Sequence, residues 1–449
     1  MEMDWKKLLS TKRLGRDDSD SQAGLVPRTE FTRDYDRIIF SSAFRRLQDK
    51  TQLFPLAKSD YVRTRLTHSL EVASVGRSLG MLAADTIIDN NQDLKDIVIP
   101  QDVGTIVSTA CLAHDIGNPP FGHKGESAIQ EWFETREDSI LKNMCEMHRQ
   151  DFLKFEGNAQ GFRTLCYLQN PTQKGGLQLT SAILGTFMKY PRASIVDELQ
   201  SGTGISGHKF GFMSSESNFF SELAVELGLI KKVGTSLAWH RHPLSFLVEV
   251  ADDICYQIMD IEDGFKVGVI KESDLWALYD PLIDMKEREK SNSIHEPQRK
   301  AEYLRAVTIH KMVNEVHEVF ANNYKGIMAG TFDTELICGM RSTKDFSRFK
   351  EFAKSKVYTD KSVLEIEACG FEVIGGLLTA FIDAIEVKAT NSVKGKIRSK
   401  TILGLLPEGV YVDGLTPYQR ALVASDFVSG MTDSYAVELY QRIRGISLP

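Results

Sequence analysis

The chain has 449 residues, 42% of them apolar and 26% charged, which is the composition of a globular protein long enough to bury a sizeable core. Its formal net charge of −7 argues against a protein whose whole surface binds nucleic acid, although a local basic pocket is compatible with it. The six cysteines form no CxxC pair and no metal-finger spacing, which fits a reducing compartment. Residues 1–10 contain no apolar signal region and no later stretch reaches the length of a membrane span, so we expect a cytoplasmic protein with no membrane partner.

Three portions are expected along the chain, which we predict to be mostly α-helical. Residues 1–37 are predicted to be an N-terminal arm, extended rather than packed over residues 11–36, because these are polar and charged and contain Gly15, Gly24 and Pro27. Residues 38–270 carry apolar side chains at three- and four-residue spacing, which predicts a helical core. Residues 271–449 are predicted to be a further helical portion packed on that core. Within it, β-branched and aromatic side chains in residues 394–412 favour a short β element, before a helix that begins at about Pro417.

His68 is the first candidate for chemistry. It begins a segment in which Val72, Val75 and Leu79 follow at helical spacing, so its side chain faces the same interior side of a helix as these core residues. A buried imidazole needs a polar partner. A core histidine bonded to a backbone carbonyl is the alternative to a metal ligand, and His68 alone does not decide between them.

A second helical segment ends at His114 and Asp115. Gly117 and two prolines follow and prevent the helix from continuing. His114 shares a face with Val107 and Ala110 and so points inward, while Asp115 is displaced around the helix by about 100°. A helix end fixed by prolines has the rigid geometry that adjacent residues need to bind one ion, although a lone His-Asp pair also arises by chance.

Residues 244–263 carry a ladder of polar side chains on an otherwise apolar helix. Asp252, Tyr256 and Asp260 follow one another at four-residue steps and therefore share a face. A solvated acidic face is the alternative reading, but acids on a buried face require a cation. We expect Asp252 rather than Asp253 to be the ligand, because only Asp252 is in register with the ladder.

His68, His114, Asp115 and Asp252 together form a ligand set of nitrogen and oxygen atoms. Such a set suits a hard or borderline divalent ion that keeps open positions for water and phosphate oxygens, and we expect Mn²⁺ or Mg²⁺ as the cofactor. An ion of this kind would bind a phosphate and lower the pKa of a bound water.

A histidine and a glutamate follow the His-Asp pair along the chain. His123 precedes Glu126 by three residues, among glycines that permit close backbone approach. Imidazoles titrate near neutrality and a carboxylate can orient them, which is the arrangement that general acid–base catalysis needs. An ordinary loop histidine is the alternative. We predict that His123 and Glu126 are a proton-transfer pair.

These residues resemble the H…HD…D signature of the HD superfamily, carried here by His68, His114-Asp115 and Asp252. The string His-Asp-Ile-Gly-Asn-Pro-Pro-Phe-Gly-His-Lys-Gly-Glu at residues 114–126 resembles bacterial deoxyguanosinetriphosphate triphosphohydrolases in particular. The likeness spans most of the chain, since it extends to residues 44–52, 63–69, 155–160, 251–254 and 431–433.

The resemblance implies roles for side chains that would otherwise be read as surface groups. Tyr256 would lie under the deoxyribose, where a 2′-hydroxyl would clash, and Asp260 would assist in recognising the sugar. Gln52 would contact the sugar or the base. The residues that would hold the triphosphate are Arg65, Lys189 and Lys209, with Asn158 as a further contact.

The reaction implied by the resemblance is hydrolysis of dGTP, or of another deoxynucleoside triphosphate (dNTP), to the deoxynucleoside and inorganic triphosphate. It also implies a homo-oligomer, as a hexamer, and a single-stranded DNA effector. Two alternatives stay open. Another HD-domain nucleotide phosphohydrolase or phosphodiesterase would share the metal ligands but need not contain the pair of His123 and Glu126. A non-catalytic nucleotide-binding regulator would be expected to have lost one of these groups.

Overall fold

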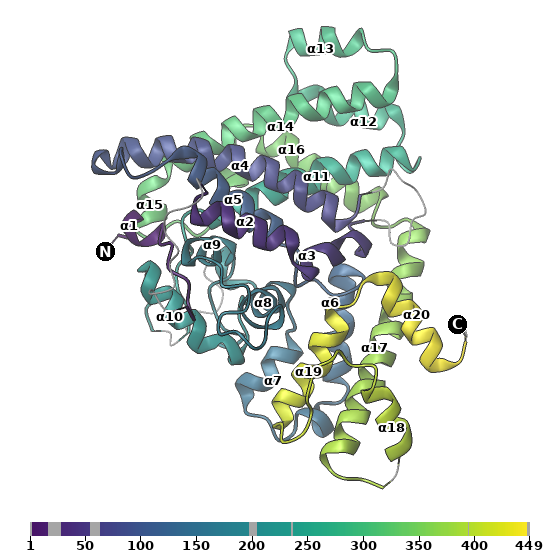
Figure 1. Cartoon of the computed structure of the whole chain (residues 1–449). Helices are drawn as coiled ribbons and strands as arrows, with labels where there is room; N and C mark the ends of the chain where they lie inside the picture. The colour runs from purple at the N-terminus through teal and green to yellow at the C-terminus, as the bar shows by residue number, and fades with distance from the viewer. Residues whose placement is uncertain are drawn as a thin grey trace.

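The computed structural model describes residues 2–16, 28–53, 63–196, 204–234, 237–393 and 395–446, and over these ranges it consists of helices and the loops between them (Figure 1). The only β pairing in these ranges is in isolated bridges of single residues, such as Thr51 with Thr64. The prediction of a mostly helical fold is confirmed.

The helices fall into an N-terminal and a C-terminal series. The first series is α1 Trp5–Leu8, α2 Glu30–Phe40, α3 Ser42–Arg46, α4 Arg65–Asn90, α5 Pro100–Ala113, α6 Gly122–Glu134, α7 Glu146–Leu153, α8 Gly157–Arg163, α9 Ser181–Phe187, α10 Ser217–Leu227 and α11 Ser245–Lys266. The second is α12 Glu272–Tyr279, α13 Met285–Asn292, α14 Pro297–Asn322, α15 Tyr324–Met328, α16 Thr343–Lys356, α17 Lys361–Ala389, α18 Lys396–Leu403, α19 Pro417–Ser429 and α20 Asp433–Arg444.

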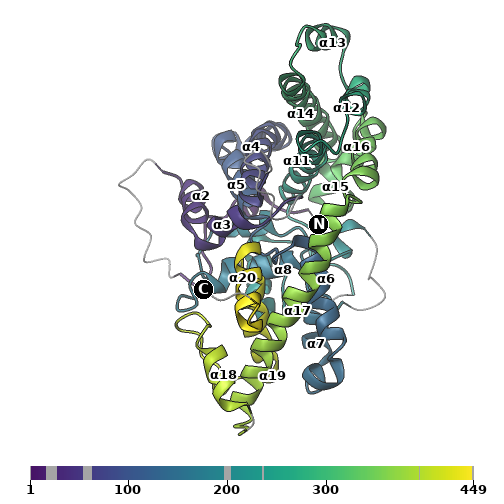
Figure 2. The same cartoon turned by 90° about the vertical axis from the view of Figure 1, so that its right-hand side faces the viewer.

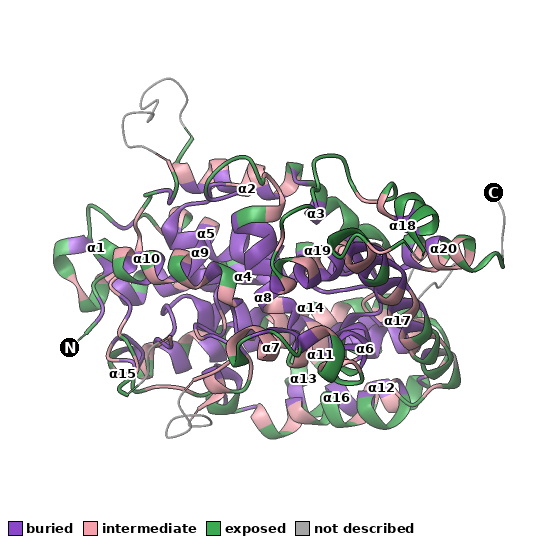
Figure 3. Ribbon diagram, turned by 90° about the horizontal axis from the view of Figure 1, so that it is seen from below, coloured by how far each residue is buried: buried purple, intermediate pink, exposed green. Residues whose placement is uncertain are grey.

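Helices α4, α5 and α11 are central to a first core cluster, whose buried apolar side chains come mainly from α1 to α5, α9 to α12 and α14 to α16. Helix α5 is buried along nearly its whole length (Figure 3). It packs closely on α4 because two glycines remove the side chains between them. A Cβ on Gly76 would lie 2.5 Å from Sγ of Cys111, and one on Gly80 would lie 2.8 Å from the carbonyl oxygen of Val103. Any larger residue at these two positions would force the helices apart.

A second core cluster joins α6 and α7 to the C-terminal helices α17 to α20. In Figure 2, α17 runs beside α6, α19 and α20, and it contacts all three. The indole N–H of Trp132 in α6 donates to Oγ1 of Thr379 in α17 at 2.9 Å. Residues 121–155 therefore pack with residues 373–439, which lie far away in the sequence.

The N-terminal residues are packed rather than extended. Trp5 and Leu8 of α1 are buried, and the indole N–H of Trp5 donates to the hydroxyl of Tyr324 at 2.6 Å. Helix α2 then occupies the end of the predicted arm. The prediction of an extended arm is wrong for these residues, because tertiary contacts of a few apolar side chains outweigh a polar local composition. Residues 17–27 lie outside the described residues.

The β element predicted in residues 394–412 is also wrong for the described part of that stretch. Helix α18 occupies Lys396–Leu403 and buries Ser399 and Ile402 against its neighbours, chiefly α17. Turns follow, and α19 begins at Pro417, as predicted. The β-branched side chains that favoured a strand are accommodated in a helix because tertiary packing overrides their weak intrinsic preference.

Helix α17 is the one described helix that is long and apolar enough to cross a membrane, over Val363–Ala389 with a mean hydropathy of 1.7. The expectation that no stretch reaches this length is therefore wrong. However, 56% of the apolar stretch is buried inside the protein. Its apolar side chains form the centre of the second core cluster, which accounts for its composition.

Candidate active site

Three of the predicted metal ligands meet where α4, α5 and α11 converge. His68 lies near the start of α4, His114 directly follows α5, and Asp252 lies within α11. Nε2 of His68 lies 3.1 Å from Oδ1 of Asp252, and Nε2 of His114 lies 3.6 Å from the same oxygen. One ligand atom from each residue lies within 4.8 Å of those of the other two, which is close enough for all three to contact one ion.

The surroundings of His114 determine its tautomer. A carbonyl oxygen only accepts hydrogen bonds, so Nδ1 of His114 must carry the proton that it shares with the carbonyl oxygen of Cys111 at 2.6 Å. In the neutral form of the imidazole, which is the form that binds a metal ion, the lone pair of Nε2 faces the acids. Nε2 is buried and has no hydrogen-bond partner among the described residues, and the same holds for Oδ2 of Asp115. Buried acceptors without donors are costly, and a divalent cation would satisfy both of them.

Asp115 is held mainly by Arg65. Nη1 of Arg65 donates to Oδ1 of Asp115 at 2.7 Å, and the amide of Asn118 donates to the same oxygen. Oδ2 of Asp115 lies 3.5 Å from Nε2 of His114. Burial acts to raise the pKa of Asp115, but the charges of Arg65 and His114 outweigh burial and lower the pKa below its ordinary value. Asp115 is thus an ionised carboxylate beside the three-residue group, with one oxygen still available.

Asp252 and Asp253 are neighbours on α11 with opposite environments. Burial acts to raise the pKa of Asp252, but His114 and His68 hold it well below its usual range. Burial raises the pKa of Asp253 to about 7, because the attraction of Lys189 is too weak to offset it. Asp252, which faces the two histidines, is therefore stabilised as a charged carboxylate, whereas Asp253 is not.

The predicted proton-transfer pair lies on α6. Nδ1 of His123 lies 2.7 Å from Oε2 of Glu126, and the imidazole is 73% exposed while the carboxylate is buried. Oε1 of Glu126 accepts the backbone N–H of Gly157 at 2.8 Å, and a Cβ on Gly157 would lie 2.7 Å from that oxygen, so only glycine permits the contact. Burial acts to raise the pKa of Glu126, but the hydrogen bond to His123 and the charge of Lys209 lower it overall. Glu126 is thus a fixed carboxylate that orients an exposed imidazole.

Comparisons with known proteins agree with this arrangement. The HD domain family matches residues 65–155, and the phosphohydrolase-associated domain family matches residues 339–442. A deoxyguanosinetriphosphate triphosphohydrolase-like protein of Synechocystis sp. is 43% identical over 99% of this chain and 100% of its own length. A protein of Pseudomonas aeruginosa with the same description is 38% identical over 100% of both chains.

The chain belongs to the deoxyguanosinetriphosphate triphosphohydrolase family of the HD superfamily. A deoxyguanosinetriphosphate triphosphohydrolase of Salmonella enteritidis is also similar, at 30% identity over 93% of this chain and 94% of its own length. Membership makes the chain an HD-domain phosphohydrolase. The HD match includes His68, the His114-Asp115 pair and the proton-transfer pair, but it ends before Asp252. The structure adds Asp252 to the group.

Each of the predicted phosphate-binding cations of this family member has a carboxylate partner in the structure. Arg65 pairs with Asp115, as described above. Nζ of Lys189 lies 3.5 Å from Oε1 of Glu249, which raises the pKa of that lysine against the effect of burial. Lys189 also lies close enough to Asp252 to lower its pKa. A positive charge is thus held beside the group of two histidines and Asp252.

Lys209 lies beside the other half of the site. Its Nζ donates to Oε1 of Glu156 at 2.9 Å, and the amide of Asn158 donates to the same oxygen at 2.7 Å. Burial acts to lower the pKa of Lys209, but the charges of Glu126 and Glu156 raise it overall. The partners Glu156 and Glu249 were missed in the sequence, because an acid gives no spacing signal when its partner comes from another element.

The predicted sugar-binding residues of α11 contact a tyrosine that the sequence did not indicate. The hydroxyl of Tyr358, in the turn after α16, lies 2.5 Å from the hydroxyl of Tyr256 and 2.5 Å from Oδ2 of Asp260. Burial raises the pKa of Asp260 to about 7. Gln52 lies at the edge of the described residues, and its Oε1 is buried with no partner among them. Tyr358 carries no motif of its own, so only the fold could have found it.

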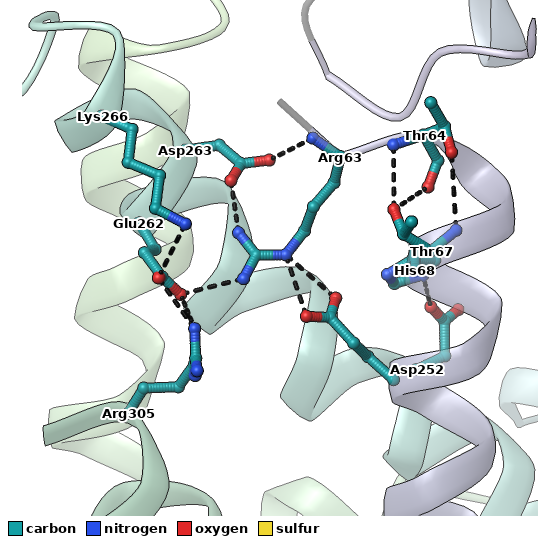
Figure 4. A network of polar contacts seen from close by, with 10 residues as sticks. Arg63, Thr64, Thr67, His68, Asp252, Glu262, Asp263, Lys266 and Arg305 are labelled. Carbon is teal, nitrogen blue, oxygen red and sulfur yellow. Dashed lines mark hydrogen bonds and ion pairs between the residues drawn. The ribbon is translucent and has the colours of Figure 1, made fainter. Parts of the chain in front are cut away.

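An ion network fixes the start of α4 to the end of α11 (Figure 4). The guanidinium of Arg63 contacts Asp263, Oε2 of Glu262 at 3.0 Å and Oε2 of Glu71 at 2.9 Å. Arg305 of α14 contacts the same Glu262 at 2.6 Å. Because α4 carries His68 and α11 carries Asp252, this network fixes the distance between two of the three residues in the group.

A cavity of about 1730 Å³ lies next to the loop after His114 and reaches to α19, with Ile116, Gly117 and Gln160 among its lining residues. None of His68, His114, Asp252 and His123 lines it. The large cavity and the reactive side chains therefore indicate different positions for a functional site. We assign the candidate site from the side chains, because chemistry depends on them.

Proposed function

We propose that this protein hydrolyses dGTP, or a closely related dNTP, to the deoxynucleoside and inorganic triphosphate with the help of a divalent metal ion. The observation that carries the proposal is the exposed imidazole of His123, backed by the buried Glu126, on the helix that follows the His114-Asp115 loop. A general HD phosphohydrolase needs the histidine and aspartate group, but it does not need this second pair. The family relatives described as deoxyguanosinetriphosphate triphosphohydrolases support the choice of substrate.

His68, His114 and Asp252 would hold the ion, with Oδ2 of Asp115 as a further donor. The buried acceptors on His114 and Asp115 support this donor set. When bound, a divalent ion supplies charge neutralisation at a phosphate and a lowered pKa for a coordinated water. A mixture of imidazole and carboxylate ligands favours Mn²⁺ or Mg²⁺.

The chain's own residues would move the proton. When Nδ1 of His123 donates to Glu126, the exposed Nε2 is the atom that accepts a proton from water or delivers one to the leaving 5′-oxygen. Because Glu126 is ionised, it stabilises the imidazolium that forms after a proton has been accepted. Both directions are compatible with the geometry, so the acid and base roles stay open.

Cations around the site would bind the phosphates. Arg65, Lys189 and Lys209 would neutralise oxygens of the triphosphate from fixed positions, which is a large contribution to catalysis of phosphoryl transfer. Each of them has a carboxylate partner in the protein without substrate. The partners keep the buried charges compensated, and triphosphate oxygens would take over part of that role on binding.

The sugar would lie against the tyrosines of the site. Tyr256 lies one helical turn beyond Asp252, so a ligand held near Asp252 would reach it. A 2′-hydroxyl would then have to displace the ring, which favours a deoxynucleotide. Asp260, Gln52 and Asn158 complete the proposed substrate contacts.

The products of hydrolysis test this proposal directly. The protein is incubated with each dNTP and with GTP in the presence of Mn²⁺ or Mg²⁺, and the products are separated by ion-exchange chromatography and identified by phosphorus NMR. We expect deoxyguanosine and inorganic triphosphate from dGTP, and a turnover reduced by about a hundredfold or more but still measurable in the His123→Ala variant. Pyrophosphate or orthophosphate as the phosphorus product would contradict cleavage of the bond between the α-phosphorus and the 5′-oxygen, and would favour another HD-domain phosphohydrolase.

We also propose a cytoplasmic homo-oligomer, a hexamer by family resemblance, with a catalytic core at residues 38–270 and a C-terminal portion beyond it. A single-stranded DNA effector is proposed on the same resemblance. Light scattering that returns the mass of one chain at working concentration would contradict the oligomer. Turnover that is unchanged by single-stranded oligonucleotides would contradict the effector.

A further inference from the structure

The turn between α19 and α20 reaches the candidate site through one carboxylate. Asp433, the first residue of α20, is 1% exposed. Its Oδ1 accepts the backbone N–H of Phe121 at 3.0 Å, and its Oδ2 accepts the backbone N–H of Thr51 at 3.0 Å. Phe121 immediately precedes α6 and Thr51 immediately precedes Gln52. The two oxygens of Asp433 therefore join two segments of the site that are distant in sequence.

The backbone of Phe121 is in a conformation that needs support. Its φ is 63°, in the left-handed region that residues other than glycine rarely adopt. Helix α6 also has no capping side chain from its own sequence. A carboxylate at this end satisfies a free N–H and interacts favourably with the helix dipole. Asp433 provides the hydrogen-bond acceptor and the negative charge from a position 312 residues further along the chain.

A buried lysine connects the same segments. Lys50 is 2% exposed, and its ammonium donates to the carbonyl oxygens of Asn118 at 2.5 Å and Ser429 at 2.9 Å. Asn118 belongs to the loop before α6, and Ser429 is the last residue of α19. Burial lowers the pKa of Lys50 to about 7, and the charge of Asp433 acts in the opposite direction. The loop before α6 is therefore held on both sides by the C-terminal helices.

We propose that Asp433 is a positioning residue for the proton-transfer pair. By holding Phe121 in the left-handed conformation, it sets the direction from which α6 presents His123, and Lys50 holds the preceding loop in place. The role rests on the proposed function of His123. Residues 339–442, which match the phosphohydrolase-associated domain family, include Asp433. This region would therefore help to position the catalytic group.

The first test is the Asp433→Asn variant, which keeps the size of the side chain but replaces one acceptor oxygen with a donor. We expect kcat for dGTP to fall by about tenfold to a hundredfold, as misplacement of a catalytic group by a fraction of an ångström can cause. Metal content should stay within about twofold of wild type, because His68, His114 and Asp252 lie on other helices. Ser434→Ala is the matched control. Ser434 follows Asp433 in the first turn of α20 and its Oγ donates to Oδ1 of Asp49 at 2.8 Å, and loss of this hydrogen bond should leave kcat within about twofold.

A double variant separates positioning from general stability. In a His123→Ala background, Asp433→Asn should lower the residual kcat by less than about twofold, because a residue that acts through His123 has nothing left to position. If Asp433→Asn causes the same fold loss in both backgrounds, the proposal is overturned.

Hydrogen–deuterium exchange tests the same contact without turnover. We expect faster exchange in residues 117–126 and at Thr51 in Asp433→Asn, with α4 unchanged. Lys50→Met gives a second variant if Asp433→Asn does not fold, and it should speed exchange in the same loop. Wild-type protein that hydrolyses no dNTP would contradict the proposed function. Unchanged exchange at Phe121 in Asp433→Asn would overturn the positioning role, whatever the substrate is.

Discussion

The two halves of the candidate site are held in different ways. His68, His114 and Asp252 lie on or directly beside helices α4, α5 and α11, which pack closely in the first core cluster. His123 and Glu126 lie on α6, a helix of 13 residues in the second core cluster. Its first turn depends on Phe121 in a left-handed conformation and on a carboxylate from α20.

The two halves therefore depend on different packing partners. The positions of the two histidines and Asp252 follow from helix packing, with glycines on α4 allowing α5 to approach. The position of the proton-transfer pair follows from contacts between segments more than 300 residues apart, such as the 312 residues between Phe121 and Asp433. A substitution in one half should therefore leave the structure of the other half intact.

The largest effect is expected from His114→Ala. Turnover should fall by about a thousandfold or more and bound metal should be lost, because a ligand of the proposed ion is removed. The helical fold should survive, since α5 is held by its apolar side chains rather than by His114. Metal analysis by mass spectrometry, circular dichroism and hydrogen–deuterium exchange of α6 measure the three outcomes.

Two controls make this result specific. His310→Ala replaces an exposed histidine on α14 and should change neither metal content nor turnover. Asp252→Asn should lose metal, while Asp253→Asn should keep it, because only Asp252 faces both histidines. Full activity of metal-free His114→Ala would contradict the assignment of the group. If Asp253→Asn lost the metal and Asp252→Asn kept it, the choice of Asp252 as ligand from its four-residue spacing with Tyr256 and Asp260 would be wrong.

The next largest effect is expected from Glu126→Gln, in the other half of the site. Glutamine keeps the shape and can still accept the N–H of Gly157, but it cannot stabilise a charged His123. We expect kcat to fall by about a hundredfold with metal content unchanged. Steady-state kinetics and metal analysis measure both. A variant that loses metal to the same extent as His114→Ala would show that the two halves are not separate.

The sequence alone could predict most of the first half. Spacing placed His68 and Asp252 on inward helix faces, and the prolines after Asp115 correctly marked the end of α5. The sequence did not show that Arg65 would occupy one oxygen of Asp115, because that contact joins two helices. It also predicted α19 from Pro417 but missed α18, where packing on α17 outweighs β-branched composition.

The second half was less accessible to sequence reasoning for a physical reason. The short string around His123 and Glu126 was visible, but the residues that hold it come from far along the chain. Asp433 was noted only as part of a family motif, and Tyr358 had no signal at all. Contacts of this kind depend on how helices are arranged in space, and a single sequence contains no pattern that reports it.

A smaller effect is expected from Tyr256→Ala. Wild-type protein should favour dGTP over GTP by at least about tenfold, because an unpaired or displaced 2′-hydroxyl costs about 1–3 kcal/mol. Removing the ring should narrow this ratio, chiefly by admitting GTP. The measurement is kcat/KM for both nucleotides in wild type and variant. An unchanged ratio would place the discrimination elsewhere, with Tyr358, Gln52 and Asp260 the next residues to test.

The smallest effect concerns the stability of the first core cluster at low pH. His242 is fully buried, with Nε2 lying 3.1 Å from the carbonyl oxygen of Leu8 and Nδ1 accepting the N–H of Leu244 at 3.2 Å. Burial lowers the pKa of His242 to about 4, although the bond to Leu8 acts in the opposite direction. The folded protein therefore holds this imidazole neutral in a range where the unfolded chain binds a proton.

The sign of the pH dependence follows from that difference. Above the ordinary pKa of about 6.5 both states are neutral and the full contribution of His242 to stability is present, and it is lost as the pH falls toward 4. Between pH 7 and pH 5 the free energy of unfolding should drop by about 2 kcal/mol because of this residue.

Urea denaturation at both pH values should show a smaller drop in the free energy of unfolding for His242→Asn than for wild type, while His310→Asn, at an exposed position, should behave as wild type. Parallel losses in wild type and His242→Asn would show that His242 does not control acid stability. If the prediction holds, hydrogen exchange at pH 5 should increase first in residues 2–16, which His242 anchors through Leu8, and not in α6 or α17 of the second core cluster.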